Sequence, residues 1–225
     1  DTHTGIPRSE SGRLVTGRGR FIHTINLPRM LHVAFVRSPI AHGRIQRIDT
    51  SRAAEMPGVE AVLTAGDVRT VIADVPITKL DIMPDHVSPE QPPLADGHVR
   101  FQGEPVALVA AQTLDQAEDA VSFISMKYDE LTVTGNIIPA STVEIGSEFR
   151  NSADYVTLEA SFSFARQTGV TLEPRGIVAS YDPSDDRLEI WISHQSPQLV
   201  QTIVAKFLGM PENRIIVRTG DVGGG

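Results

Sequence analysis

The chain has 225 residues, a length that predicts one or two domains. Its formal net charge is -8, which argues against a nucleic-acid-binding protein, because such proteins need a basic face to neutralise phosphates. It contains no cysteine, so no disulfide, iron–sulfur cluster or thiolate-bound zinc can form within it.

The first half of the chain alternates predicted strands and helices. Residues 1–14 are polar and predict a flexible arm, and Arg13, Arg18 and Arg20 beside glycines predict a solvent-exposed turn. Five prolines between residues 72 and 98 exclude a helix or a central strand and predict a long surface loop. Apolar runs and capping signals predict strands at 30–36, 44–48, 59–63, 106–111 and 124–128, with helices at 52–56 and 113–122. This order of elements indicates an α/β or α+β fold.

The second half begins after a linker-like stretch at residues 134–150, which separates a domain at 15–133 from one at 151–225. Apolar patterns predict strands at 156–164, 177–181, 188–193 and 215–217. The clearest helix is capped by Ser196, has Pro197 in its first turn and ends at Gly209. A glycine loop at 221–225 follows the last strand directly.

Gly223, Gly224 and Gly225 form the first candidate site. Consecutive glycines let main-chain N–H groups approach an anion or a cofactor edge that a Cβ atom would block. From composition alone, a glycine run at a chain end is more often a flexible tail. Its position directly after a buried strand favours a cofactor loop, although its spacing matches neither common type of nucleotide-binding loop.

Other polar residues give weaker signals. His194 stands at a strand-to-helix junction, where α/β folds place sites, but a polar residue at a strand end is the simpler interpretation. Glu173 and Arg175 flank a proline and predict a structural ion pair at a turn. The seven histidines show no ligand spacing, so we expect no metal ion bound directly by this chain. The absence of a GxSxG motif argues against a hydrolase.

No apolar run approaches the roughly 18 residues that span a bilayer, and no signal peptide opens the sequence. We therefore expect a cytoplasmic protein without a membrane span.

Ten segments, in their order and spacing, resemble the large subunits of the xanthine dehydrogenase / aldehyde oxidase / carbon monoxide dehydrogenase family. The matching segments of the first domain are 17–21, 31–45, 56–64, 99–107, 117–120 and 128–131, and those of the second are 172–176, 193–198, 207–209 and 221–225. The resemblance implies an a/b hammerhead domain followed by the beginning of a molybdopterin-binding domain. It also implies an incomplete piece of a larger redox enzyme.

The resemblance implies a molybdenum hydroxylase, which oxidises an aldehyde, an N-heterocycle or carbon monoxide with oxygen derived from water. Gln195 matches the glutamine whose amide hydrogen-bonds an oxo ligand of the molybdenum, and a neutral donor suits that role because it adds no charge. Gly223, Gly224 and Gly225 match the start of a loop that packs against the pterin. The family's catalytic base and active-site arginine would lie downstream, so no catalytic residue is expected here and the chain alone is expected to be inactive.

The implied cofactor is molybdenum–molybdopterin in its cytosine dinucleotide form. The implied partners are the remainder of the molybdenum subunit, an iron–sulfur subunit, an FAD subunit and a small-molecule substrate, with no nucleic acid. The alternative is a non-catalytic structural or docking module with no cofactor of its own. Gln195 and the glycine loop favour the enzyme, because a docking module needs neither.

Overall fold

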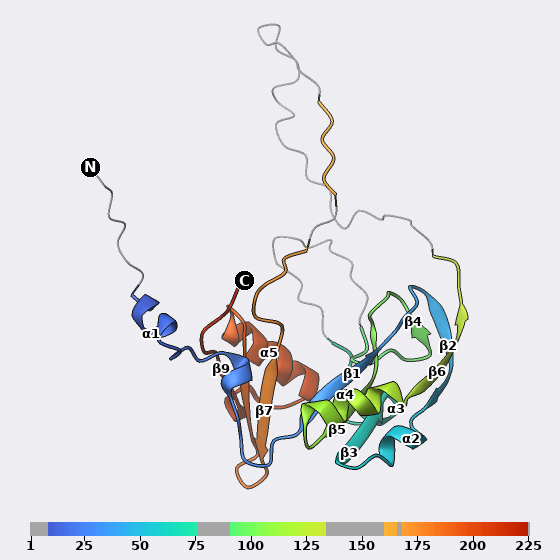
Figure 1. Ribbon diagram of the computed structural model, residues 1–225, viewed down its shortest axis with the longest axis horizontal. Coiled ribbons are helices and arrows are strands. Elements are labelled where there is room, and N and C mark those ends of the chain that lie inside the picture. The colour runs from blue at the N-terminus through green and yellow to red at the C-terminus, as the bar shows by residue number, and fades with distance from the viewer. Residues whose placement is uncertain (1–8, 76–90, 134–159, 166–167, 225) are drawn as a thin grey trace, which may run out of the picture.

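The computed structural model describes residues 9–75, 91–133, 160–165 and 168–224. Its elements form two parts that lie side by side (Figure 1). The first part contains strands β1 to β6 and the second contains β7 to β9 with helix α5. None of the helices in the described ranges is both long enough and apolar enough to cross a membrane.

Two antiparallel sheets of three strands make up the first part. One has the order β1–β5–β3, from His32–Arg37, Pro105–Ala111 and Val59–Thr64. The other has the order β4–β2–β6, from His98–Val99, Gly43–Asp49 and Ser125–Glu130. Helix α4 (Leu114–Ser122) packs on β1 and β5, and helix α2 (Ser51–Ala54) contacts β3 and α4.

Helix α4 begins where the sequence predicts, at a reciprocal cap. The Gln116 main-chain N–H donates to Thr113 Oγ1 at 3.2 Å, and Gln116 Oε1 accepts from the Thr113 N–H at 3.1 Å. These bonds satisfy N–H groups that the first helical turn leaves without partners. Ala117 and Ala120 are fully buried, and Ala120 belongs to a core with Val36 and Val109. The mixed α/β architecture predicted from the sequence is therefore confirmed.

Two local features of this part were not predicted. Ala65–Val68 forms a short helix, α3, because the Asp67 carboxylate accepts hydrogen bonds from the Thr64 N–H and hydroxyl. The expected surface loop at 72–98 ends in the core, with Leu94 and Ala95 only 2% and 1% exposed. Residues 76–90 of that loop lie outside the described ranges.

The second part is a three-stranded sheet in the order β7–β8–β9. Its strands are Ile177–Asp182, Arg187–Ile192 and Ile215–Arg218, with helix α5 at Pro197–Leu208 and a 3-10 turn, η3, at Glu212–Arg214. Strands β7 and β8 form an antiparallel hairpin, whereas β8 and β9 are parallel and are joined through α5. Because β8 and β9 are parallel, their carboxyl ends meet at one edge of the sheet.

Helix α5 begins and ends where the sequence predicts. Pro197 occupies its first turn, and Gly209 ends it with a φ of 63°, in the left-handed region that favours glycine. Ala205 packs into a small core with Ile190 and Ile215. Ser196 stands at the predicted cap position, but its side chain makes no capping hydrogen bond.

The N-terminal segment differs from the expected arm. Ser11–Val15 forms helix α1, which lies beside the second part of the molecule rather than the first (Figure 1). The physical reason is an ion pair between Arg13 and Asp221, two residues 208 positions apart. Residues 1–8, the expected linker at 134–150 and residues 156–159 of the expected strand at 156–164 lie outside the described ranges, and residues 160–164 are described without regular structure.

Candidate functional site

The candidate site is a hollow of about 280 Å³ at the carboxyl edge of the β7–β8–β9 sheet. The residues that line it follow β8 or β9 directly and comprise Ser193, His194, Gln195, Ser196, Val222 and Gly224. The parallel β8–α5–β9 connection brings these two loops together. Gln195 and Gly224, which the sequence singled out 29 positions apart, therefore line one hollow.

The Gln195 side chain is exposed at this hollow. Within the described ranges it makes no hydrogen bond to another side chain or to the main chain. Its amide therefore has both its N–H groups and its oxygen available to a ligand.

His194 has a local structural role. Its Nδ1 atom accepts a hydrogen bond from the Ser196 main-chain N–H at 3.0 Å. Since Nδ1 is the acceptor, the neutral ring has its proton on Nε2. The bond shapes the two-residue turn around Gln195, immediately before helix α5. The interpretation of His194 as a polar residue at a strand end fits this geometry.

The Glu173 carboxylate accepts three hydrogen bonds near the hollow. Its Oε2 atom accepts from the Ser193 hydroxyl and from the Gly223 N–H, both at 2.6 Å. Its Oε1 atom accepts from the Ile22 N–H at 3.1 Å. The Glu173 N–H donates in return to the Gly223 carbonyl oxygen at 3.4 Å. One residue thus joins the N-terminal segment, the end of β8 and the glycine loop.

The expected ion pair between Glu173 and Arg175 is absent from the described residues, and the Glu173 carboxylate binds hydrogen-bond donors instead. Partial burial opposes ionisation of this group and on its own would raise the pKa. The bonds from Ser193, Gly223 and Ile22, together with the nearby His23, outweigh burial and hold the pKa of Glu173 below its ordinary value. Glu173 is therefore ionised at neutral pH.

The glycines of the loop pack against protein rather than opening space on every side. A Cβ atom on Gly223 would collide with the Cβ atom of Glu173, and one on Gly224 would lie 2.6 Å from the Cβ atom of Thr171. Gly224 also has a φ of 149°, which disfavours any other residue. The sequence predicts that these positions lack side chains to admit a ligand. In the structure, Thr171 and Glu173 occupy the space that a Cβ atom on Gly224 or Gly223 would need. Gly225 lies outside the described ranges.

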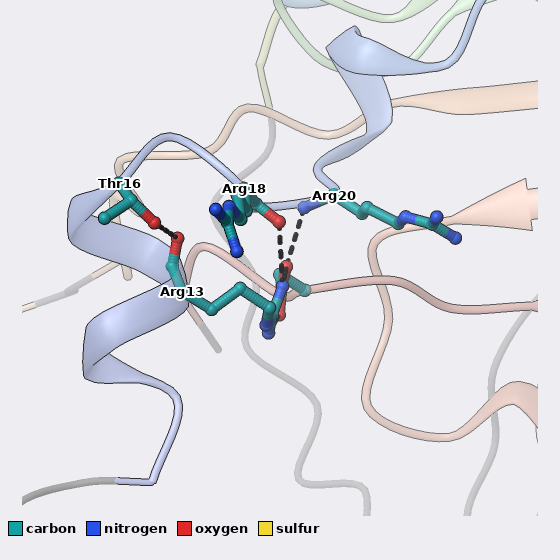
Figure 2. A network of polar contacts seen from close by, with 5 residues as sticks. Arg13, Thr16, Arg18 and Arg20 are labelled. Carbon is teal, nitrogen blue, oxygen red and sulfur yellow. Dashed lines mark hydrogen bonds and ion pairs between the residues drawn. The ribbon is translucent and has the colours of Figure 1, made fainter.

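Asp221 anchors the glycine loop on its other side. Arg13 donates to both oxygens of the Asp221 carboxylate, at 2.6 and 2.5 Å, and the Arg20 N–H donates to Oδ2 at 2.7 Å. Figure 2 shows these donors converging from the N-terminal segment, with Arg13 also bonded to the Arg18 carbonyl oxygen. The expectation of a solvent-exposed turn was wrong for Arg13, whose partner lies too far along the chain for a local pattern to reveal.

The chemistry of the lining suits an anionic ligand with polar edges. No carboxylate is among the lining residues, because Glu173 and Asp221 bind main-chain and side-chain donors behind the loop. Helix α5 begins beside Ser196, and the N-terminal end of a helix attracts negative charge. Gln195 adds a neutral donor. In the described part of the chain, no group of three or more histidine, aspartate or glutamate side chains could hold a metal ion.

Comparison with known proteins identifies the family. A family model described as "Aldehyde oxidase and xanthine dehydrogenase, a/b hammerhead domain" matches residues 16–132, more than half of the chain. The chain belongs to the aldehyde oxidase and xanthine dehydrogenase family. A second model, "Molybdopterin cofactor-binding domain", matches residues 131–225 and includes the whole hollow. The predicted order of a hammerhead domain and a molybdopterin-binding domain is confirmed.

Relatives within the aldehyde oxidase and xanthine dehydrogenase family match almost the whole chain. The nicotine 6-hydroxylase large subunit of Paenarthrobacter nicotinovorans is 35% identical over 98% of the chain and 29% of its own length. The carbon monoxide dehydrogenase large chain of Hydrogenophaga pseudoflava is 33% identical over 96% of the chain and 30% of its own length. The chain thus spans about three tenths of these relatives.

Solved structures agree with this assignment. Quinoline 2-oxidoreductase from Pseudomonas putida 86 superposes with a TM-score of 0.84 at 37% identity, covering 99% of the chain and 30% of the larger protein. Aldehyde oxidoreductase from Desulfovibrio gigas gives 0.78 at 26% identity, covering 97% of the chain and 26% of the larger protein.

Proposed function

We propose that this chain supplies the first part of the molybdenum-binding large subunit of a molybdenum hydroxylase. The enzyme would oxidise an aldehyde, an N-heterocycle or carbon monoxide with oxygen derived from water. The observation on which the proposal depends is that Gln195 and Gly224 line one hollow at the carboxyl edge of β8 and β9. A docking module would not need an unpartnered amide and a glycine loop at the same place.

The residues of the hollow fit a molybdopterin cofactor. Gln195 would donate a hydrogen bond to a ligand of the metal, and the loop at Val222 and Gly224 would contact the pterin, joined by Gly225. The absence of carboxylates from the lining avoids repulsion of the anionic cofactor. When bound, the cofactor supplies two-electron oxidation of the substrate carbon. The chain's own contribution is to position that group and to hold a neutral donor beside it.

We further propose that the cofactor is the cytosine dinucleotide form and that iron–sulfur and FAD subunits receive the electrons. The names of the relatives support a multi-subunit enzyme, since one is a large subunit and another a large chain. These names also cover different substrates, nicotine and carbon monoxide. We also propose that substrate selection, the catalytic base and the active-site arginine lie outside residues 1–225, because this chain spans only about three tenths of these relatives.

Metal and pterin analysis of the purified complex that contains this chain tests the proposal. We expect molybdenum near one atom per large subunit, together with a pterin dinucleotide released on denaturation. A stable, pure complex with neither would support the docking module and contradict the enzyme. The nucleotide released identifies the form of the cofactor independently of activity.

A further inference from the structure

The N-terminal segment lies directly on the glycine loop. We call residues 13–22 the N-terminal strap. Together with the preceding Gly220, the described part of the glycine loop comprises residues 220–224. Arg20 and Asp221 are bonded twice: the Asp221 N–H donates to the Arg20 carbonyl oxygen at 2.9 Å, and the Arg20 N–H donates to Asp221 Oδ2 at 2.7 Å. A Cβ atom on Gly220 would collide with the same Arg20 carbonyl oxygen. The two segments are therefore in main-chain contact.

The strap also contacts the far end of the loop through Glu173. The Ile22 N–H donates to one oxygen of the Glu173 carboxylate, and the other oxygen accepts from the Gly223 N–H. Next to this bond, Gly176 leaves room for the Ile22 side chain, because a Cβ atom there would lie 2.7 Å from Ile22 Cγ2. The strap is thus joined to both ends of the glycine loop, directly at Asp221 and through one side chain at Gly223.

The glycine loop has no regular secondary structure of its own. Residues 219–224 form no helix or strand, so no ladder of main-chain hydrogen bonds within an element fixes their position. A loop of this kind is positioned mainly by hydrogen bonds and ion pairs from its neighbours. A loop that is disordered before the cofactor binds loses conformational entropy on binding, and this loss weakens the affinity. A loop that is already held in its binding geometry avoids that cost.

We propose that the N-terminal strap is a positioning element for the cofactor loop, anchored by the ion pair between Arg13 and Asp221. The strap holds the loop in the geometry that binds the cofactor before the cofactor arrives. The statement about the cofactor depends on the function proposed above, whereas the statement about loop order does not.

Arg13 is the residue to change, because it contacts the glycine loop through its side chain alone. Its guanidinium donates to both carboxylate oxygens, a planar arrangement that the single ammonium group of lysine cannot reproduce. Asp221 is the less exposed partner, at 19% against 40% for Arg13. Arg18 offers a matched control: it has the same charge and an exposed side chain in the same strap, and only its main-chain N–H and carbonyl oxygen take part in the network.

The experiment compares the complete enzyme complex as wild type and with Arg13→Ala, Arg13→Lys or Arg18→Ala. Hydrogen exchange of residues 218–224 reports loop order, and molybdenum content after prolonged dialysis reports cofactor retention. We expect Arg13→Ala to speed both exchange and molybdenum loss about three- to tenfold, the range for a well-formed but partly exposed charged pair. The exchange and molybdenum-loss rates of Arg13→Lys should lie between those of the wild type and Arg13→Ala. The rates of Arg18→Ala should equal those of the wild type.

Two further measurements keep the test specific. Raising the salt concentration should bring the exchange and molybdenum-loss rates of the wild type closer to those of Arg13→Ala, because salt screens exposed ion pairs. Exchange within β5 and α4 serves as an internal reference, and equal loosening there would contradict a local role. Arg13→Ala that behaves as Arg18→Ala in both readouts would overturn the proposal. A wild-type complex without molybdenum would instead contradict the proposed function, while the exchange data would still decide the role of the strap.

Discussion

The Glu173 carboxylate accepts a hydrogen bond from the Gly223 main-chain N–H at 2.6 Å. The same oxygen accepts from the Ser193 hydroxyl, two residues before Gln195. A single atom therefore links the loop that follows β9 to the loop that follows β8. The position of Gln195 relative to Gly224 depends on this link, since both residues line the hollow from opposite loops.

Glu173→Gln should loosen this link with little change of volume. An amide has one acceptor oxygen, whereas the carboxylate presents acceptors to two main-chain N–H groups, those of Ile22 and Gly223. The Ser193 hydroxyl can rotate and accept a hydrogen bond from the new amide NH2 group. The N–H groups of Ile22 and Gly223 can only donate, so one of them loses its acceptor. We expect the free energy of unfolding to fall by about 1–3 kcal/mol. Denaturant unfolding of the complete subunit measures it.

Glu118→Gln provides the control for this substitution, because it makes the same chemical change on the exposed face of α4. It should leave unfolding unchanged within about 0.5 kcal/mol. Equal effects of the two substitutions would show that Glu173 has no special role in holding the loops together.

Acid should weaken the same link. The pKa of Glu173 is lower in the folded chain than its ordinary value of 4.5, so the unfolded chain binds the proton more readily. Its stabilising contribution is therefore complete above about pH 4.5 and is lost as the pH falls through the lower folded value. The stability difference between wild type and Glu173→Gln should shrink over that range. A difference that stays constant from pH 7 to pH 3 would contradict the ionised role of Glu173.

The sequence predicted the elements of this fold because their signals are local. Helix α4 follows from Thr113 and Gln116, three residues apart, and helix α5 from Pro197 and Gly209 at its two ends. Hydrophobic runs placed eight of the nine described strands within a residue or two, as expected when burial determines the pattern. The two-residue strand β4 was not predicted, and residues 160–164 of the strand expected at 156–164 form no regular structure.

The sequence did not reveal what holds the site together, because those contacts are distant along the chain. Arg13 and Asp221 are 208 residues apart, and Glu173 and Gly223 are 50 apart. Neither pair belongs to a repeating pattern of charge or hydrophobicity. Glu173 drew attention only through its neighbour Arg175, and the structure gives it different partners. The only local signal for the role of Glu173 is that its carboxylate lies in a segment that forms no helix or strand.

Gly223→Ala tests whether the loop packs as tightly as the structure indicates. The added methyl group would collide with the Cβ atom of Glu173 and force residues 171–173 away from the loop. We expect a loss of about 1–3 kcal/mol in unfolding free energy, typical of overpacking, with faster hydrogen exchange at residues 220–224. Gly12→Ala is the control, since no atom lies within 4 Å of the added group. Normal stability of Gly223→Ala would mean that the loop can move aside.

Gln195→Ala tests the assignment of the amide itself. Gln195 is exposed and makes no hydrogen bond to other described residues, so the substitution should leave folding unchanged. If the amide contacts a ligand of the metal, turnover should fall about 10- to 100-fold, the usual range for such a group. The electron paramagnetic resonance signal of the dithionite-reduced complex should shift as well, a readout that requires no knowledge of the substrate. Gln198→Ala, an exposed glutamine of α5 that does not line the hollow, should change neither quantity. An unaltered signal together with unaltered turnover in Gln195→Ala would remove Gln195 from the site.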